Sequence, residues 1–498
     1  MSTVTLNIDV HSDEHIYMQI YKYIRSEIES GALPFNSRLP STRHLAAHLQ
    51  VSRNTIDMAY GQLLDEGYIE SYPKKGFFVS DIESLVPAFS NKTAIPNPKM
   101  SKTDHFADRH TISSNNHSNF KSHIDDHSKD SAVYTDYQYD FSPYGIDLEN
   151  FPFGTWRKIA RDIYYDDRNF ALFQSGHRQG DEDFRTAIAN YLHQSRGVRC
   201  SADQIIVGAG TEYLLILLTQ ILGSDSIFAM EDPSYRRSYE ILHKMGYPIR
   251  PIPLDKNGMS ITKLRKTDAT VAYVTPSNHF PLGIVMPIKR RLELLNWAFE
   301  DHKRYIIEDD YDSEFRYKGK PIPSLQSINR NEKVIYLGTF SKAIAPAIRI
   351  SYLVLPKPLL EIYKTNMSFY ASTVARTEQR QLTNFITQGC FERHLNRMRN
   401  IYKAKRDYLL QAFAPYQHRV KISGENSGLH LLLTFIDGRT ANDITAAAKN
   451  AGIHLMDVSS YYIAPEHMNM KNTVILGYGA LSMEQLKTQT ECLLRILF

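Results

Sequence analysis

The chain has 498 residues, more than one domain usually contains, so at least two folded units are expected. Hydrophobic residues make up 42% of it, but the longest apolar stretch, Leu214 to Leu222, is too short to cross a bilayer, which argues against a membrane protein. The net charge of +4 neither requires nor excludes nucleic acid, and the three cysteines lack metal-ligand spacing, so no metal site is predicted. The N-terminal residues lack a signal-peptide pattern, and a cytoplasmic location is expected.

The N-terminal part of the chain has the pattern of three helices. Residues 15–30 place isoleucines at helical spacing and predict a first amphipathic helix. Ser41 can cap a second, short helix, and Ser52 can cap a third that runs to about Glu66. Two capped helices joined by a tight turn are typical of a helix-turn-helix.

A two-stranded wing is expected directly after these helices. Apolar and polar residues alternate over 68–72, a basic turn follows at 73–76, and residues 77–79 are apolar. Upstream, the window from Asn36 to Ile56 contains three arginines and no acidic residue. We therefore expect the phosphate-facing surface to lie in this window.

Between residues 81 and 138 the chain becomes polar, and this composition predicts a flexible linker. Its histidines could also be interpreted as a metal-binding tract. Their spacing is irregular and no cysteine accompanies them, so a solvated linker is the favoured interpretation. These histidines are His105, His110, His117, His123 and His127.

From residue 139 to residue 498, helical patterns alternate with short apolar runs. This alternation predicts an α/β domain with a mainly parallel sheet that helices cover on both faces. Beyond about Asn400 the pattern predicts a smaller α+β lobe with strands at HLLLTFI and NTVILGYGAL. The runs expected to form the main sheet are QIIVGA, SIFAME, ATVAYVT, RYIIEDD, KVIYLGT and ISYLVLP.

Residues 12–80 resemble the GntR family of winged-helix regulators. The resemblance rests on the run RLPSTRHLAAHLQVSRNTIDMAYGQLLDEGYIES and on the following KKGFFV. In that family the second helix of the motif lies in the major groove, where arginine can pair with guanine and asparagine with adenine. The alternative, solvated charges on a small helical domain, is disfavoured. The resemblance implies contacts with double-stranded operator DNA from Arg43, Ser52, Arg53, Asn54 and Thr55, and from the wing residues Lys74, Lys75 and Gly76.

One segment of the C-terminal region combines groups that suit pyridoxal 5′-phosphate (PLP). The run YLGTFSK ends in Lys342, and Arg349 follows seven positions later. A lysine amine forms a Schiff base with the aldehyde of PLP, while the hydroxyls of Thr339 and Ser341 and a guanidinium can hold its phosphate. This segment therefore predicts where the cofactor is attached.

Three further segments complete this pattern. In IIEDDYDSEF, Asp309 can pair with the pyridine nitrogen and Tyr311 can donate to the 3-oxygen. In EDPSYRRSY, Tyr235 offers a ring that can stack on the pyridine. In GAGTEYLLILL a helix follows a strand, and its first amides are expected to face the phosphate; these amides lie near Gly210, Thr211 and Glu212.

This C-terminal region resembles the fold-type I aminotransferases, and the whole chain resembles regulators of the MocR/GabR type. In that group an aminotransferase-like domain is fused to a GntR-type head. The resemblance implies PLP as cofactor, with Lys342 as the catalytic lysine that carries it. It also implies a head-to-tail homodimer whose two heads bind two half-sites of DNA.

The sequence departs from the aminotransferase pattern in the groups that meet the substrate. The late strand NTVILGYGAL lacks the arginine with which aminotransferases hold a substrate carboxylate. The loop usually written Asn-Pro-Thr-Gly reads SNHFPLG here, so either Asn278 or His279 is expected to meet the 3-oxygen. Arg237 either contacts an effector or the phosphate or is an exposed surface arginine, and these interpretations stay open.

These features predict a transcriptional regulator that responds to PLP, or to its aldimine with an amino compound, and controls genes of vitamin B6 or amino-compound metabolism. We expect no enzyme beyond residual half-reactions, for which Lys342 remains available as a base. One alternative is a working aminotransferase with an accessory DNA-binding head. Another is a DNA-binding scaffold with a dead cofactor domain, which is disfavoured because Lys342, Asp309 and Arg349 are all present.

Overall fold

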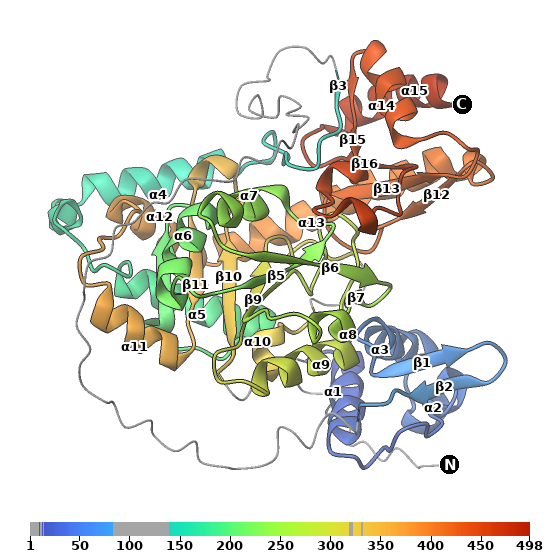
Figure 1. The fold of residues 1–498 in the computed structure, drawn as a ribbon, viewed down its shortest axis with the longest axis horizontal. Helices are drawn as coiled ribbons and strands as arrows, with labels where there is room; N and C mark the ends of the chain where they lie inside the picture. Colours follow the sequence, from blue (N-terminus) through green and yellow to red (C-terminus); the bar gives the residue numbers. More distant parts are fainter. Residues whose placement is uncertain (1–8, 10–11, 13, 83–138, 318–321, 330–331) are drawn as a thin grey trace, which may run out of the picture.

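The structure is a computed structural model, and it describes residues 9, 12, 14–82, 139–317, 322–329 and 332–498. The chain forms a small N-terminal unit, called the head, and a larger body that consists of a sheet domain and a small lobe (Figure 1). Almost all of the predicted linker, including its five histidines, lies outside the described residues.

The head is a winged helix-turn-helix, as predicted. Ser41 caps the second helix, where its hydroxyl accepts a hydrogen bond from the His44 amide at 3.2 Å. Ser52 caps the third helix by accepting from the Thr55 amide at 3.1 Å. The elements are α1 (Ile16–Glu29), α2 (Thr42–Leu49), α3 (Arg53–Asp65) and the antiparallel strands β1 (Ile69–Tyr72) and β2 (Gly76–Val79).

The apolar core of the head continues into the body. Ile82, which the sequence analysis assigns to the linker, is buried in this core, so the head extends at least to this residue. Ile288 and Leu292 of the body belong to the same buried cluster. The two units therefore share an apolar contact and are not independent domains joined only by a linker.

An eight-stranded sheet forms the centre of the body, in the order β4-β11-β10-β9-β8-β5-β6-β7. Only β11 and β7 run antiparallel to their neighbours, which confirms a mainly parallel sheet. The strands β6 and β7 have no counterpart among the predicted runs. The bounds are β4 (Ile205–Gly208), β5 (Phe228–Asp232), β6 (Ile249–Asp255), β7 (Gly258–Met259), β8 (Val271–Val274), β9 (Tyr305–Asp310), β10 (Val334–Thr339) and β11 (Ser351–Val354).

Helices cover both faces of this sheet. Consecutive residues of a strand point to opposite faces, and in β4 they pack into different buried clusters. Ile205 and Val207 join one buried cluster, whereas Ile206 between them joins another. The covering helices are α4 (Phe153–Tyr165), α5 (Glu182–Arg196), α6 (Thr211–Leu222), α7 (Arg236–Lys244), α8 (Ile261–Leu264), α9 (Ile288–Phe299), α10 (Leu325–Ile328), α11 (Lys357–Asn366) and α12 (Arg376–Thr387).

The small lobe has an antiparallel sheet in the order β12-β13-β16-β15, with β12 (Val420–Ser423), β13 (His430–Phe435), β15 (Met456–Asp457) and β16 (Thr473–Gly477). Its outer helices are α14 (Ala441–Asn450) and α15 (Met483–Leu497), and a separate parallel pair joins β14 (Ile453–His454) to β3 (Tyr139–Asp140).

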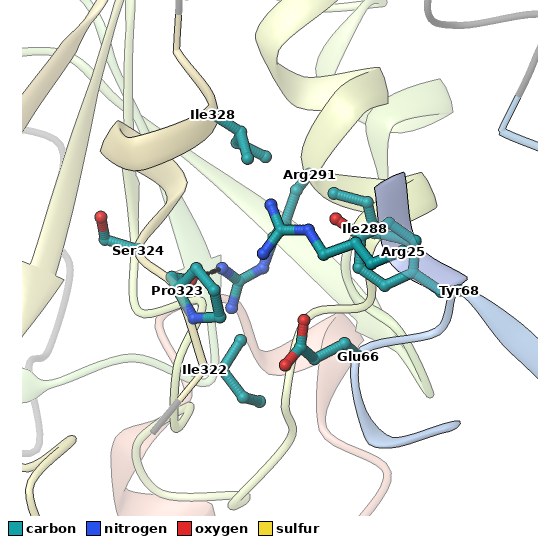
Figure 2. Close-up of a pocket in the computed structure, with 9 residues that line it drawn as sticks. All are labelled: Arg25, Glu66, Tyr68, Ile288, Arg291, Ile322, Pro323, Ser324 and Ile328. Carbon is teal, nitrogen blue, oxygen red and sulfur yellow. Dashed lines mark hydrogen bonds between the residues drawn. The ribbon is translucent and has the colours of Figure 1, made fainter. Parts of the chain in front are cut away.

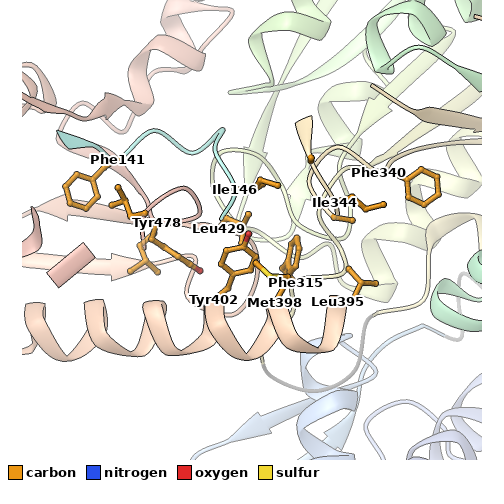
Figure 3. Packing of buried hydrophobic residues seen from close by; sticks show 14 of the residues in the cluster. Phe141, Ile146, Phe315, Phe340, Ile344, Leu395, Met398, Tyr402, Leu429 and Tyr478 are labelled. Carbon is orange, nitrogen blue, oxygen red and sulfur yellow. The ribbon is translucent and has the colours of Figure 1, made fainter. Parts of the chain in front are cut away.

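The long helix α13 (Cys390–Phe413) joins the lobe to the sheet domain and begins ten residues before the predicted boundary near Asn400. Its buried side chains Met398 and Tyr402 pack near Phe315 and Leu429 in a shared core (Figure 3).

Six strands of the main sheet point toward the same edge. β5, β6, β8, β9 and β10 are mutually parallel, and β4 points the same way because β11 runs antiparallel to both β4 and β10. Ligands of open α/β sheets bind outside the carboxyl ends of the strands. Among the described residues, no helix is long and apolar enough to span a bilayer, and no cluster of His, Cys, Asp and Glu is arranged to hold a metal ion.

Candidate cofactor site and nucleic-acid interface

The start of α3 presents polar side chains to solvent. Arg53 and Asn54 are exposed and have only weak contacts, the closest from Arg53 being 3.5 Å to Asp57. The hydroxyl of Ser52 instead lies 2.8 Å from that of Thr55, within the helix cap. Arg53 and Asn54 are therefore the two side chains of this turn with the reach to contact base edges.

The wing adds a second basic surface. Lys74 and Lys75 are exposed, and the turn holds Lys74 and Gly76 at positive φ angles of 63° and 103°. Arg38 is exposed and lies beside this turn, because a Cβ built on Gly76 would lie 3.6 Å from its Nε atom. Arg38 is missing from the predicted contacts, although it lies in the acid-free window. Arg43 is exposed near the start of α2.

Lys342 follows β10 and lies in a partly buried position at the carboxyl edge of the sheet. Its Nζ donates to the carbonyls of Pro143 and Tyr144 at 2.7 and 2.9 Å. Loss of water around the amine lowers the pKa of Lys342 to about 8, although the neighbouring Asp312 acts in the opposite direction. A lysine with this pKa is partly uncharged near neutral pH and can act as a nucleophile.

Asp309, the penultimate residue of β9, is buried, and the Tyr273 hydroxyl donates to its Oδ2. Burial, with the charge of Asp310 added, raises the pKa of Asp309 to about 7. A positively charged ring nitrogen placed against this carboxylate would stabilise its ionised form.

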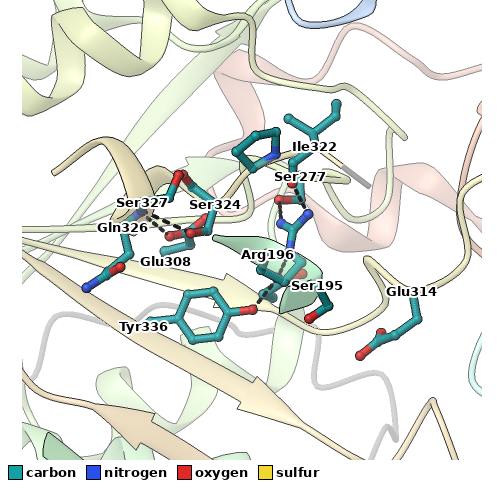
Figure 4. Close-up of polar contacts among 12 residues, drawn as sticks. Ser195, Arg196, Ser277, Glu308, Glu314, Ile322, Ser324, Gln326, Ser327 and Tyr336 are labelled. Atoms are coloured by element: carbon teal, nitrogen blue, oxygen red, sulfur yellow. Dashed lines mark hydrogen bonds and ion pairs between the residues drawn. The ribbon is translucent and has the colours of Figure 1, made fainter. Parts of the chain in front are cut away.

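The next residue, Asp310, points to the other face of the sheet and fixes the end of β9. Its Oδ2 accepts from Arg196 Nε at 2.8 Å and from the Tyr336 hydroxyl. The Arg196 guanidinium also donates to Ser277, at the end of the neighbouring strand (Figure 4). Arg196 thus holds two strand ends together behind the site.

Asn278, Tyr311 and Asp312 form one hydrogen-bonded group. The Asn278 Nδ2 atom lies 3.3 Å from the Tyr311 hydroxyl and donates to both oxygens of Asp312 at 2.8 and 3.0 Å. Burial raises the pKa of Asp312 to about 8. His279 instead bonds the Pro233 carbonyl at 3.2 Å, away from Tyr311, and burial lowers its pKa to about 3. Of the two alternatives, the structure brings Asn278 to Tyr311.

An anion cradle lies at the N-terminus of α6. Gly210 caps this helix at a φ of 96°, and a Cβ there would clash with the Arg349 guanidinium. Arg349 pairs with the Glu212 carboxylate, and Arg237 lies 3.7 Å from the same group. Burial acts to raise the pKa of Glu212, but hydrogen bonds from its own amide and from Arg349 lower it overall. Two guanidiniums and a helix N-terminus, which begins with Thr211, thus converge on one anion.

Hydroxyls close the other side of this cradle. Thr339 Oγ1 lies 3.1 Å from the Ser341 hydroxyl and accepts from the Ser351 hydroxyl at 2.9 Å. Ser351 is a further hydroxyl that the predicted site does not include. These groups can reorient to donate to a phosphate, because a hydroxyl is both donor and acceptor.

Tyr235 supplies an aromatic wall from the start of α7. Its ring packs edge-on against Phe280, with ring centroids 5.8 Å apart. The Phe280 ring also packs edge-on against Tyr311, with ring centroids 6.1 Å apart. The four sequence segments that carry the predicted cofactor residues therefore meet at one edge of the sheet. His430 of the small lobe closes the site near Lys342, and burial lowers its pKa to about 4.

Four residues of this site are absent from the predicted set: Tyr273, Asp312, Ser351 and His430. Tyr273 and Ser351 lie inside strands whose apolar pattern predicts only burial. His430 begins the small-lobe strand β13 and is distant in the sequence from the other segments of the site. Only Asp312, which directly follows Tyr311 and lies two positions beyond the acidic end of β9, has a signal in its neighbourhood.

Two family models match the chain. Residues 16–79 match the model of bacterial regulatory proteins of the gntR family, and residues 147–474 match aminotransferase class I and II. The HTH-type transcriptional regulator YdeL of Bacillus subtilis is 37% identical over 476 residues, which cover 95% of each chain. The chain belongs to the MocR/GabR-type subfamily of GntR transcriptional regulators.

Further similarities agree with this assignment. The probable rhizopine catabolism regulatory protein MocR of Rhizobium meliloti is 31% identical over 97% of this chain and 94% of its own. The solved structure of the kynurenine aminotransferase of Pyrococcus horikoshii covers 73% of this chain and 92% of its own, with a TM-score of 0.63 and 25% identity. The cofactor of this family is PLP.

The residues at the sheet edge fit this cofactor. An amine, a carboxylate, an aromatic ring and an anion cradle correspond to its aldehyde, ring nitrogen, ring face and phosphate. The close approach of Arg349 to Gly210 leaves room only for a glycine at the phosphate end of the site.

Proposed function

We propose that PLP bound in the body controls how the two heads of a homodimer engage operator DNA. The observation that carries this proposal is that one chain holds both an exposed helix start, at Arg53 and Asn54, and a partly buried lysine beside an anion cradle. Bivalent binding depends on the spacing of the heads, so a small change in the body can produce a large change in affinity.

The cofactor supplies an aldehyde that accepts an amine and an electron-poor ring. In this proposal the Lys342 amine attaches it, and Asp309 binds the ring nitrogen. Tyr311 and Asn278 bind the 3-oxygen, and Tyr235 packs on the ring face. The phosphate is bound by Thr339, Ser341 and Arg349 and by the first amides of α6, from Gly210, Thr211 and Glu212.

Arg349 pairs with the Glu212 carboxylate through Nη2, and the other N–H groups of its guanidinium would be available to hold the phosphate. Arg237, half-exposed at the mouth of the cradle, is proposed to contact either the phosphate or an effector. The effector is PLP itself or an amino compound that reacts with it. The regulated genes are then those of vitamin B6 or amino-compound metabolism.

DNA binding is assigned to the exposed surfaces of the head. Arg53 and Asn54 contact bases, and Ser52 and Thr55 contact a phosphate beside the helix start. The wing and α2 contribute Lys74, Lys75, Gly76 and Arg43 to the backbone. Arg38 joins this set because of its place beside the wing turn.

Transamination is limited to residual half-reactions in this proposal. Lys342 can act as a base once a substrate amine has displaced it. However, the buried strand β16 (Thr473–Gly477) offers no arginine for a substrate carboxylate. Multiple turnovers with a common amino donor at ordinary enzymatic rates would reverse this assignment in favour of the aminotransferase.

The experiment uses the full-length protein and a duplex that it selects from a random DNA library. Affinity, footprint and transcription are compared with and without PLP, and borohydride reduction followed by mass spectrometry checks for a pyridoxyl adduct on Lys342. Identical affinity, footprint and transcription in both conditions would defeat the proposed control by PLP.

A further inference from the structure

The head contacts the body next to the C-terminal end of α3. The Ile288 amide of α9 donates to the Glu66 carbonyl at 2.8 Å, and a Cβ built on Gly67 would lie 2.6 Å from the Cβ of Pro287. Around this contact, side chains from α1 and the wing meet α9 and the segment 322–328 (Figure 2). The helix whose start is exposed for DNA therefore ends against the body.

One ion pair crosses this contact in a partly buried setting. Arg316 Nη2 donates to Asp65 Oδ2, on the last residue of α3, at 2.8 Å. The Arg316 side chain is 5% exposed, so the pair is shielded from solvent on the body side. A second pair, Lys289 with Asp81 at 3.3 Å, also joins head to body but is exposed on both sides.

The backbone around Arg316 is bound to the segment 426–428. The Tyr317 amide donates to the Asn426 carbonyl at 3.0 Å, and the Gly428 amide donates to the Phe315 carbonyl at 2.8 Å. Arg316 and Ser427 therefore form an isolated antiparallel bridge. These two hydrogen bonds couple the position of the Arg316 backbone to that of Ser427.

The same short segment reaches the cofactor site. The Ser427 hydroxyl donates to Asn278 Oδ1 at 2.9 Å, while Asn278 Nδ2 binds Asp312 and lies next to the Tyr311 hydroxyl. A Cβ built on Gly428 would lie 2.7 Å from Asn278 Nδ2, which is too close for a side chain. The Gly428 backbone is therefore packed tightly against the Asn278 amide. Close-packed groups pass small displacements on.

We propose that the chain Asp65–Arg316–Ser427–Asn278 couples occupancy of the cofactor site to the placement of the head. The inference rests on the proposed function and names how the site regulates DNA binding. Tyr311, Asn278 and Asp312 surround the expected position of the 3-oxygen. Any adjustment of Asn278 to that oxygen shifts its bond to Ser427, and the bridge carries the shift to the arginine that holds the end of α3.

Arg316 and Ser427 are positioning residues in this scheme, because neither reaches the cofactor or the DNA. Their effect is therefore read as a coupling factor: the ratio of the PLP dissociation constants measured without and with the selected duplex. Thermodynamic linkage requires the same factor for the effect of PLP on DNA affinity, so each variant is measured in both directions.

The test compares full-length wild type with S427A, R316K and the control K289Q. S427A removes the bond between Ser427 and Asn278, neither of which belongs to the head, and R316K weakens the shielded pair without removing its charge. K289Q breaks the exposed ion pair between the same two units. We expect S427A and R316K to move the coupling factor toward one by roughly 2- to 30-fold and K289Q to leave it within about twofold of the wild-type value.

The outcomes separate the two proposals. A wild-type coupling factor of one would defeat the proposed function and this inference together. A wild-type factor that differs from one in either direction and that S427A preserves would overturn only the contact chain, and so would an equal change in K289Q. Because R316K alters a buried residue, thermal unfolding checks that this variant is folded. If R316K is not folded, the S427A result alone decides the outcome.

Discussion

The DNA-facing surface of the head and the cofactor site of the body are built in opposite ways. In the head, the proposed base contacts are neighbours in the chain, and Arg53 and Asn54 are exposed. In the body, segments between Pro143 and His430 converge, and Asp309 is buried with a pKa raised to about 7.

This difference decides when each site gains its binding energy. The exposed head residues keep their hydration until DNA arrives, so their contribution depends on the partner and on salt. The body residues are already desolvated and held by neighbours such as Tyr273. The position of the Asp309 carboxylate is therefore set before the cofactor binds, which favours a high affinity for one ligand shape.

The largest expected effect is the loss of Lys342. K342A removes the amine that attaches the cofactor, so the borohydride adduct and the absorption band of the bound cofactor should both disappear. K342R is the matched control for charge, since it keeps a cation but no nucleophile. An adduct at this position is impossible in both variants; a PLP-dependent change in DNA binding that survives in both would show that attachment is not needed.

In the head, R53A and N54A should each weaken binding to the selected duplex by about 1–3 kcal/mol and relax the preference at one base pair. R236A is the matched control, because Arg236 begins α7 as Arg53 begins α3 and each pairs with an acid four residues later. K74A should instead weaken binding to all sequences and lower the salt slope by about one. Equal losses in R53A and R236A would contradict the interface.

The phosphate cradle can be tested with two ligands. Arg349 has a φ of 51°, so it is replaced by asparagine, which tolerates this conformation. R349N should weaken PLP binding by about 1.5–3 kcal/mol, because it removes a charged donor and frees Glu212 to repel the phosphate. Binding of pyridoxal, which lacks the phosphate, should change little. A similar loss for both ligands would place Arg349 outside the phosphate site.

Arg237 provides the comparison for this prediction. It is half-exposed and lies 3.7 Å from Glu212, so R237A should have a smaller effect on PLP affinity than R349N. If R237A alters only the response to added amino compounds, titrated by absorption spectra, Arg237 belongs to the effector. An unchanged response to both ligands would leave it a surface arginine.

The fold of the head could be predicted from the sequence because its signals are local. Ser41 and Ser52 cap helices where the serine, the turn and the apolar spacing agree. The main sheet was predictable for a related reason, since buried parallel strands are continuous apolar runs. Strand β6 was not predicted because its residues Ile249–Asp255 contain two prolines, which argue against a strand.

The cofactor site could be predicted only where chemistry and motif coincide. Lys342 stands out because it follows an apolar strand, and Asp309 because it lies at the acidic end of one. Tyr273, by contrast, looks in the sequence like one more apolar strand residue. The role of its hydroxyl is visible only in the folded structure, where it donates a hydrogen bond to Asp309. Nothing local marks Ser427 or Arg316, whose contacts join segments more than a hundred residues apart.

The smallest expected effect concerns pH and sharpens the contrast between the two regions. The Lys342 amine has a pKa lowered to about 8 by loss of water, and only its uncharged form attacks an aldehyde. Below this pKa the amine is protonated, so the rate of cofactor attachment should rise roughly fivefold from pH 7 to pH 8 and level off above pH 9. Stopped-flow absorbance after mixing with PLP measures the rate. A rate that keeps rising toward pH 10 would mean that the attacking amine is an ordinary exposed lysine, and that the desolvated setting of Lys342 does not prepare it for attachment.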